Sequence, residues 1–146
     1  MSLDEGPATV AVLVTQVAGA APLAALCSIE KIAVDVVPSP VGALAVLRDP
    51  AEGAGAAAAV SRRLGGNLVV LLERREERIS AVRWTGGVRG EELPAGLVLS
   101  DAPAVLEDLL LGGVEVAGVD GVVSSVGMSR WTAMRLLASS ARATRR

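Results

Sequence analysis

The pattern of apolar and polar positions is clearest between Asn67 and Trp84, where a continuous apolar run meets a charged turn and then a half-polar run. Residues 68–72 are five consecutive aliphatics, a length typical of a strand buried on both faces. Residues 74–77 are two arginines and two glutamates, which are costly to bury and therefore predict a solvated turn. Residues 79–84 then return antiparallel, so we expect a β-hairpin at the centre of a sheet.

Strand and helix patterns alternate before this hairpin. Runs of aliphatic and β-branched residues predict strands at residues 9–17, 33–37 and 41–47. Pro38 and Pro40 remove backbone donors and predict a turn between the last two runs. Leu23, Leu26 and Cys27 recur at helical spacing, which predicts a first helix with these side chains turned inward.

A second helix has a clear start signal. Asp49 suits the N-cap, Pro50 the first helical position, and Glu52 the third position after the cap. The helix then runs through residues 56–64, and Gly65-Gly66 supplies a left-handed end that leads into the central strand.

The resulting order of strand, helix, strand, strand, helix, strand is that of the split-βαβ arrangement. The sequence therefore predicts one α+β domain over residues 1–146. We expect a two-layer sandwich with a mostly antiparallel or mixed sheet and a β-α-β-β-α-β (ferredoxin-like) core, followed by C-terminal helices.

The C-terminal third is less regular. Its pattern predicts a short edge strand at 96–99, a helix at 105–111, and a glycine-rich connection at 112–128 with a short strand at 114–117. A last helix starts after Ser129. It places one stripe of apolar residues opposite a stripe of arginines: Ala133, Met134, Leu137 and Ala141 against Arg135, Arg142 and Arg146. We expect residues 1–7 to be flexible and residues 122–146 to form a basic amphipathic helical segment.

Composition predicts an aliphatic core and a soluble protein. The chain is 51% hydrophobic with no Phe or Tyr, and its abundance of Ala, Gly, Val and Arg is typical of a GC-rich genome. The single cysteine, Cys27, excludes an internal disulfide and fits a reducing compartment. No apolar run approaches the roughly 18–20 residues of a membrane span, and the acidic N-terminus lacks a signal-peptide pattern. We expect a cytoplasmic location and no membrane contact.

Charge is distributed unevenly. Five of the 14 basic residues follow the last acid, so the segment after Asp120 carries +5, while the remainder, with nine basic and 16 acidic residues, carries −7. These five are Arg130, Arg135, Arg142, Arg145 and Arg146. The basic segment either lies on the acidic body of its own or a neighbouring chain or contacts nucleic acid. The low overall pI and the lack of interleaved aromatics favour the first.

Three short motifs have weak functional interpretations. Residues 53–58 fit GxGxxA, but an N-cap aspartate and Glu52 precede them, so the glycines should lie within a helix rather than cradle a phosphate. Residues 87–90 fit GxxG, which joins two helices in an RNA-binding module but here follows a strand. Ser28-x-x-Lys31 matches a nucleophile–base spacing without its usual companion motifs. We predict no cofactor.

The lack of histidine removes the commonest general base and metal ligand. The acidic pairs are adjacent in sequence, so their side chains diverge, and we predict no metal site. If the chain is an enzyme, Cys27 or Ser28 with Lys31 is the candidate site. The default prediction for Cys27 is a buried, protonated thiol.

Trp131, flanked by Arg130 and Arg135, is the candidate interaction hot spot, although a Trp packed over the sheet fits equally well. The favoured function is a non-enzymatic protein-interaction or homo-oligomeric assembly module that uses the C-terminal helix and an exposed sheet edge. The alternatives are nucleic-acid or acidic-partner binding through the arginines of this helix, and a small-molecule-binding domain or enzyme.

Overall fold

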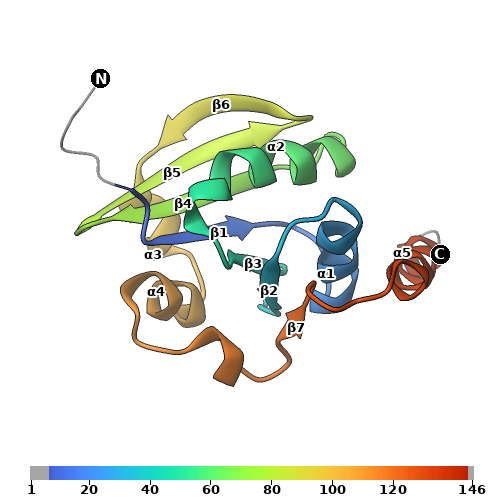
Figure 1. The fold of residues 1–146 in the computed structure, drawn as a ribbon. Coiled ribbons are helices and arrows are strands. Elements are labelled where there is room, and N and C mark those ends of the chain that lie inside the picture. The colour runs from blue at the N-terminus through green and yellow to red at the C-terminus, as the bar shows by residue number, and fades with distance from the viewer. Residues whose placement is uncertain (1–6, 145–146) are drawn as a thin grey trace.

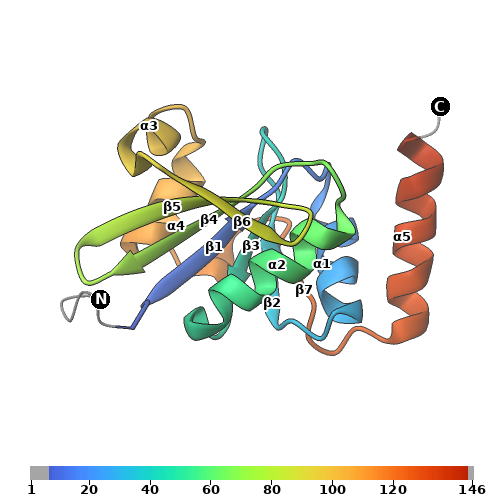
Figure 2. The same cartoon turned by 90° about the horizontal axis from the view of Figure 1, so that it is seen from above.

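The computed structural model describes the backbone of residues 7–144 and the side chains of residues 7–139. In this range the chain forms a seven-stranded sheet and five α-helices (Figures 1 and 2). The elements, in chain order, are β1 (Val10–Val14), α1 (Ala20–Ile29), β2 (Val34–Val37), β3 (Leu44–Leu47), the 3-10 turn η1 (Pro50–Glu52), α2 (Gly53–Arg63), β4 (Val69–Arg75), β5 (Arg78–Thr85), β6 (Val88–Leu93), α3 (Ala95–Ser100), α4 (Ala104–Leu111), the 3-10 turn η2 (Val116–Gly118), β7 (Val123–Ser124) and α5 (Arg130–Thr144).

The strand order is β6-β5-β4-β1-β3-β2-β7, and each neighbouring pair is antiparallel. The predicted α+β class and antiparallel sheet are therefore confirmed. The ferredoxin-like arrangement is not confirmed, because the sheet has seven strands and its full order differs from the one expected. Three of these strands, β5, β6 and β7, lie outside the predicted six-element core.

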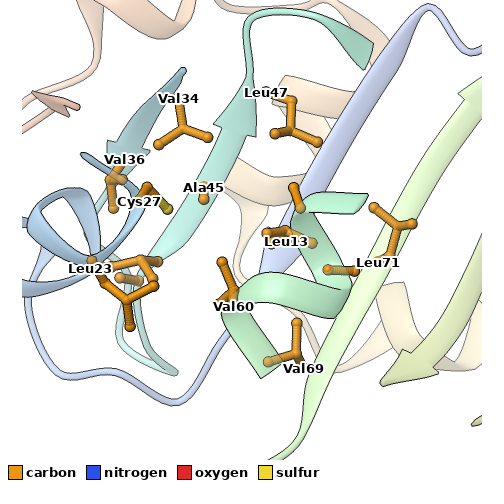
Figure 3. Close-up of a cluster of buried hydrophobic side chains, with 14 of the residues drawn as sticks. Leu13, Leu23, Cys27, Val34, Val36, Ala45, Leu47, Val60, Val69 and Leu71 are labelled. Atoms are coloured by element: carbon orange, nitrogen blue, oxygen red, sulfur yellow. The ribbon is translucent and has the colours of Figure 1, made fainter. Parts of the chain in front are cut away.

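The sheet buries both faces, which corrects the expected two-layer sandwich. On one face, α1 and α2 cover a cluster that includes Leu13, Val60 and Leu71 (Figure 3). On the other face, the segment that contains α3 and α4 covers a second cluster, in which Leu72 from β4 and Leu106 from α4 take part. Figure 2 shows these two helix layers on opposite sides of the strands. The second layer arises because the central strands carry apolar side chains on both faces of the sheet, and each face needs cover.

The central hairpin is confirmed in its two strands and corrected at its turn. Val69 and Leu71 of β4 face the α1–α2 cluster, and Val70 and Leu72 face the other. β4 continues to Arg75, which pairs with Arg78 of β5, so only Glu76 and Glu77 remain in the turn. Glu76 has a φ of 55°, the left-handed value that a tight two-residue hairpin turn requires.

The start of the second helix follows the predicted cap. The Asp49 side chain accepts a hydrogen bond from the Ala51 N–H at 3.0 Å, and the chain forms one 3-10 turn before α2. Gly53 lies inside α2, where a Cβ would stand 3.0 Å from a carboxylate oxygen of Glu73 and 3.3 Å from a methyl of Leu71. The lack of a side chain at Gly53 therefore lets the helix approach β4 closely.

Two expectations for the C-terminal third are wrong. Residues 96–99 belong to α3, whose first turn is closed by hydrogen bonds from Leu97 and Val98 to the Pro94 carbonyl. Residues 114–117 form no strand; the 3-10 turn η2 begins at Val116, and the strand β7 forms later, at residues 123–124. The sequence pattern also misses the edge strand β6 at residues 88–93, because five of its six residues are exposed and leave no apolar alternation to detect.

Candidate functional site

Helix α5 packs on α1 rather than on the sheet (Figure 2). Helix α1 is apolar around its circumference, and six of its ten residues are buried. An apolar helix needs cover on more than one side. The sheet covers one side of α1, and α5 supplies cover on the other through Ala133, which is fully buried, and Leu137, which joins the same core cluster.

The opposite side of α5 exposes large apolar side chains. Trp131 is 71% exposed and Met134 is 54% exposed, beside the exposed Arg130 and Arg135. Trp131, Met134, Arg135 and Ala138 follow the i, i+3, i+4, i+7 spacing of one helix face. We call these four residues the outer face of α5.

The exposure of this outer face shows where the side chains of Trp131 and Met134 lie relative to the positions expected from the sequence. Trp131 points to solvent and does not pack over the sheet. Met134, predicted on the inward stripe with Ala133 and Leu137, lies mostly exposed, whereas Ala133 is fully buried and Leu137 packs against the core cluster. Arg135 lies outward as expected. Arg142 falls within α5 but beyond the described side chains, and Arg145 and Arg146 fall beyond the described backbone.

The segment before α5 is fixed to the body of the protein by serine hydroxyls. Ser125 is 5% exposed; its Oγ accepts the Val34 N–H at 2.9 Å and lies 2.7 Å from the Ile32 carbonyl oxygen, to which it donates. The Ser129 Oγ accepts the Thr132 N–H at 3.1 Å and so caps the helix as predicted. These contacts set the direction in which α5 leaves β7.

Ser28 and Lys31 do line a common pocket, but it is small. The pocket has a volume of about 190 Å³ and is lined by Ser28, Lys31, Ile32, Ala33, Ser125 and Val126. Ligand sites are usually about 300–1,000 Å³. The Ser28 hydroxyl lies 3.4 Å from the Met128 carbonyl oxygen, to which it donates, and Lys31 adopts a left-handed φ of 61° at the end of α1. Ser28 thus ties α1 to the segment before α5, and Lys31 lets the chain turn away from the end of α1.

Cys27 lies apart from this pocket, in the core between α1 and the sheet (Figure 3). Its side chain is fully buried, as predicted. Burial, with a smaller contribution from the charge of Glu30, raises the pKa of the thiol from 9.0 to about 12. The thiol is therefore protonated at neutral pH and a poor nucleophile.

The ion pairs found in the described part of the chain all lie outside α5. They are Arg48–Asp35, Arg63–Glu30, Arg75–Glu73 and Arg83–Glu91. The hydrogen bond and charge of Asp35 raise the pKa of Arg48, which also donates to Ser124 and so links β3 to β7. No group of three or more metal-ligating side chains occurs among residues whose side chains are described.

No helix in the described range is long and apolar enough to cross a membrane. Comparison of the chain with known proteins found no matching family model, no matching curated protein and no matching solved structure.

Proposed function

We propose that this chain is a non-enzymatic module that self-associates through the outer face of α5. The observation that carries this proposal is the combination of Trp131, 71% exposed, with Met134, 54% exposed, and Arg135 on one face of a helix. Tryptophan and arginine are the residues most enriched at interaction hot spots. An isolated exposed apolar residue is ordinary, whereas two large ones in adjacent positions of a helix face are typical of a contact surface.

The expected strength of this contact can be bounded. Transferring an apolar side chain of this size from water to a packed interface contributes about 1.5–3 kcal/mol. A two-fold dimer buries Trp131 and Met134 twice, and both are already partly buried, so these side chains supply at most roughly 6–12 kcal/mol against an association cost of roughly 4–15 kcal/mol. We therefore expect a reversible equilibrium that depends on protein concentration.

The exposed sheet edge is a weaker candidate surface. β6 is an edge strand, but Arg89, Glu91 and Glu92 are exposed along it and discourage pairing with another strand. The other edge, β7, is only two residues long. The helix therefore carries the contact in this proposal.

We also infer that the first six elements after the N-terminus form a split-βαβ core of the ferredoxin-like kind. The support is that β1 and β2 lie on either side of β3 and are both antiparallel to it, so α1 connects two strands that run in the same direction. β5, β6 and β7 are then extensions of this core. Such a core would act as a rigid scaffold for α5. The cytoplasmic location stays a prediction from the single cysteine.

Sedimentation at micromolar to near-millimolar concentrations tests the proposed function. The mass of the wild-type chain should rise from 14.8 kDa toward twice that value, and Trp131→Ser should remain monomeric. Val88→Thr is the matched control, because Val88 is 68% exposed on β6 and the substitution retains a β-branched residue. A wild-type chain that stays monomeric throughout, or a Trp131→Ser variant that associates normally, overturns the proposal.

A second candidate function is nucleic-acid binding through the arginines of α5. It is favoured by the exposure of Arg130 and Arg135, neither of which takes part in the ion pairs found among the described residues. Phosphate contacts release counterions, so affinity for a duplex should fall steeply with salt. Binding that survives deletion of residues 130–146 would rule this function out.

A further inference from the structure

Helix α4 also has an exposed side, and its charge is opposite to that of the outer face of α5. In α4, Leu106, Leu109 and Leu110 are buried against the sheet. The opposite side exposes Ala104, Glu107, Asp108 and Leu111, again at i, i+3, i+4, i+7 spacing, with Leu111 55% exposed. We call these four residues the outer face of α4.

The two outer faces match in both charge and hydropathy. The outer face of α5 combines Trp131 and Met134 with Arg135, and that of α4 combines Leu111 with Glu107 and Asp108. The charges around each face have one sign: residues 101–120 contain five acids and no base, whereas residues 130–146 contain five bases and no acid. All five of those acids are exposed, and none takes part in an ion pair found in the described part of the chain.

The fold keeps these two faces apart within one chain. α5 packs against α1, on the side of the sheet that α1 and α2 cover, whereas α4 covers the opposite side (Figures 1 and 2). Arg74 donates a hydrogen bond to the Leu110 carbonyl of α4 at 3.2 Å, and not to Glu107 or Asp108. A second molecule is needed to bring the two faces together.

We infer that the partner of α5 is α4 of a second copy of this chain. Arg135 of one copy pairs with the carboxylates of Glu107 and Asp108 of the other, and Trp131 and Met134 cover the exposed Leu111. Under two-fold symmetry the same contact forms twice, so a closed dimer results. This inference rests on the proposed function and assigns the surface that receives α5.

Opposite charges across such a contact select the correct partner, and like charges weaken it. Arg135→Glu places an acid against the acidic α4, and Asp108→Arg places a base against the basic α5. The dimer formed by either variant alone should therefore dissociate. Mixed together they should associate, because the acid introduced at position 135 of one copy meets the base introduced at position 108 of the other. The second contact of this mixed dimer keeps both native residues.

The test is sedimentation of the wild type, the two variants and their equimolar mixture, with circular dichroism to confirm folding. Each variant should lose at least about tenfold in dimer affinity, since like charges across an interface cost several kcal/mol. The mixture should recover to within about threefold of the wild type, since opposite charges face each other at both contacts. Arg89→Glu, an exposed reversal on β6, is the matched control and should behave as the wild type.

The outcomes separate this inference from the proposed function. If Trp131→Ser abolishes association but the mixture stays as weak as its components, the outer face of α5 is the contact and α4 is not its partner. If either charge variant associates as strongly as the wild type, the inference is likewise overturned. If the wild type never associates, both fail together.

Discussion

The Oγ of Ser125 accepts a hydrogen bond from the backbone N–H of Val34 at 2.9 Å, across 91 residues of sequence. The pair joins the end of β7 to the start of β2, the strand that leads away from α1. It lies in the buried part of the protein, where each polar group needs a partner. The Ser125 hydroxyl is therefore one of the contacts that hold the chain in place as it enters α5, beside the backbone hydrogen bond from the Ser125 N–H to the Val34 carbonyl.

Replacing this hydroxyl should measurably lower stability. Ser125→Ala leaves the buried Val34 N–H without its acceptor, which costs about 1–3 kcal/mol. Urea unfolding should show this loss, whereas Ser100→Ala, which removes an exposed hydroxyl that donates to the nearby Leu97 carbonyl, should change stability by less than about 0.5 kcal/mol. Equal stabilities of the two variants would contradict the structural role of Ser125.

Replacing each of two glycines with alanine should change the stability of the fold in opposite directions. Gly42 has a φ of 131°, and a Cβ there would collide with the Thr15 carbonyl oxygen, so Gly42→Ala should cost at least about 2–3 kcal/mol. Gly55 lies exposed in α2 with no neighbouring atom near the Cβ position, so Gly55→Ala should stabilise by up to about 1 kcal/mol. Thermal unfolding measures both. A tolerated Gly42→Ala would show that the β2–β3 connection differs from the one described.

Cys27 should be unreactive in the folded protein. Its thiol is fully buried and its pKa is raised to about 12, so little thiolate exists at neutral pH and a reagent cannot reach it. Labelling with Ellman's reagent should be slow without denaturant and fast in concentrated urea. Rapid labelling of the native chain would instead revive a catalytic role for this residue.

The same thiol should make stability fall at high pH. The unfolded thiol loses its proton near 9.0, whereas the folded thiol keeps it up to about 12, so between these values the unfolded state binds fewer protons. The free energy of unfolding is therefore unaffected by Cys27 below pH 9.0 and falls above it, by at most about 1.4 kcal/mol per pH unit. The chain has one lysine and no tyrosine, so few other groups titrate in this window.

Cys27→Ala is the control for this pH dependence. It should lower stability overall, since it leaves a small cavity, but its free energy of unfolding should not show the Cys27-dependent decline above pH 9.0. Parallel curves for the wild type and Cys27→Ala would show that the thiol does not hold its proton in the fold.

The sequence identifies elements that carry strong local signals. The aliphatic run of β4 marks a strand buried on both faces, and Asp49 with Pro50 marks a helix start, whatever lies around them. Weak local signals fail where tertiary contacts decide the structure. Leu97 to Leu99 look like a strand, yet the chain turns into α3 there because Val98 and Leu99 can then reach the second core cluster.

The candidate surface is predictable only in part. The spacing of Trp131 and Arg135 indicates one helix face, but which stripe of α5 turns inward depends on how it meets α1, and sequence periodicity does not specify that partner. The sequence pattern therefore places Met134 on the wrong side. It also misses the outer face of α4, because Glu107 and Asp108 look like an isolated acidic pair and not like part of a stripe that ends in Leu111.

Fluorescence quenching at different protein concentrations tests the role of Trp131 most directly. Trp84 is 8% exposed and Trp131 is 71% exposed, so acrylamide should quench mainly Trp131 in dilute protein. As concentration rises and the mass doubles, quenching should fall toward that of a Trp131→Phe variant, in which only Trp84 emits. Quenching that stays constant while the mass doubles would show that the chain associates through another surface, and constant quenching with constant mass would show that it does not self-associate.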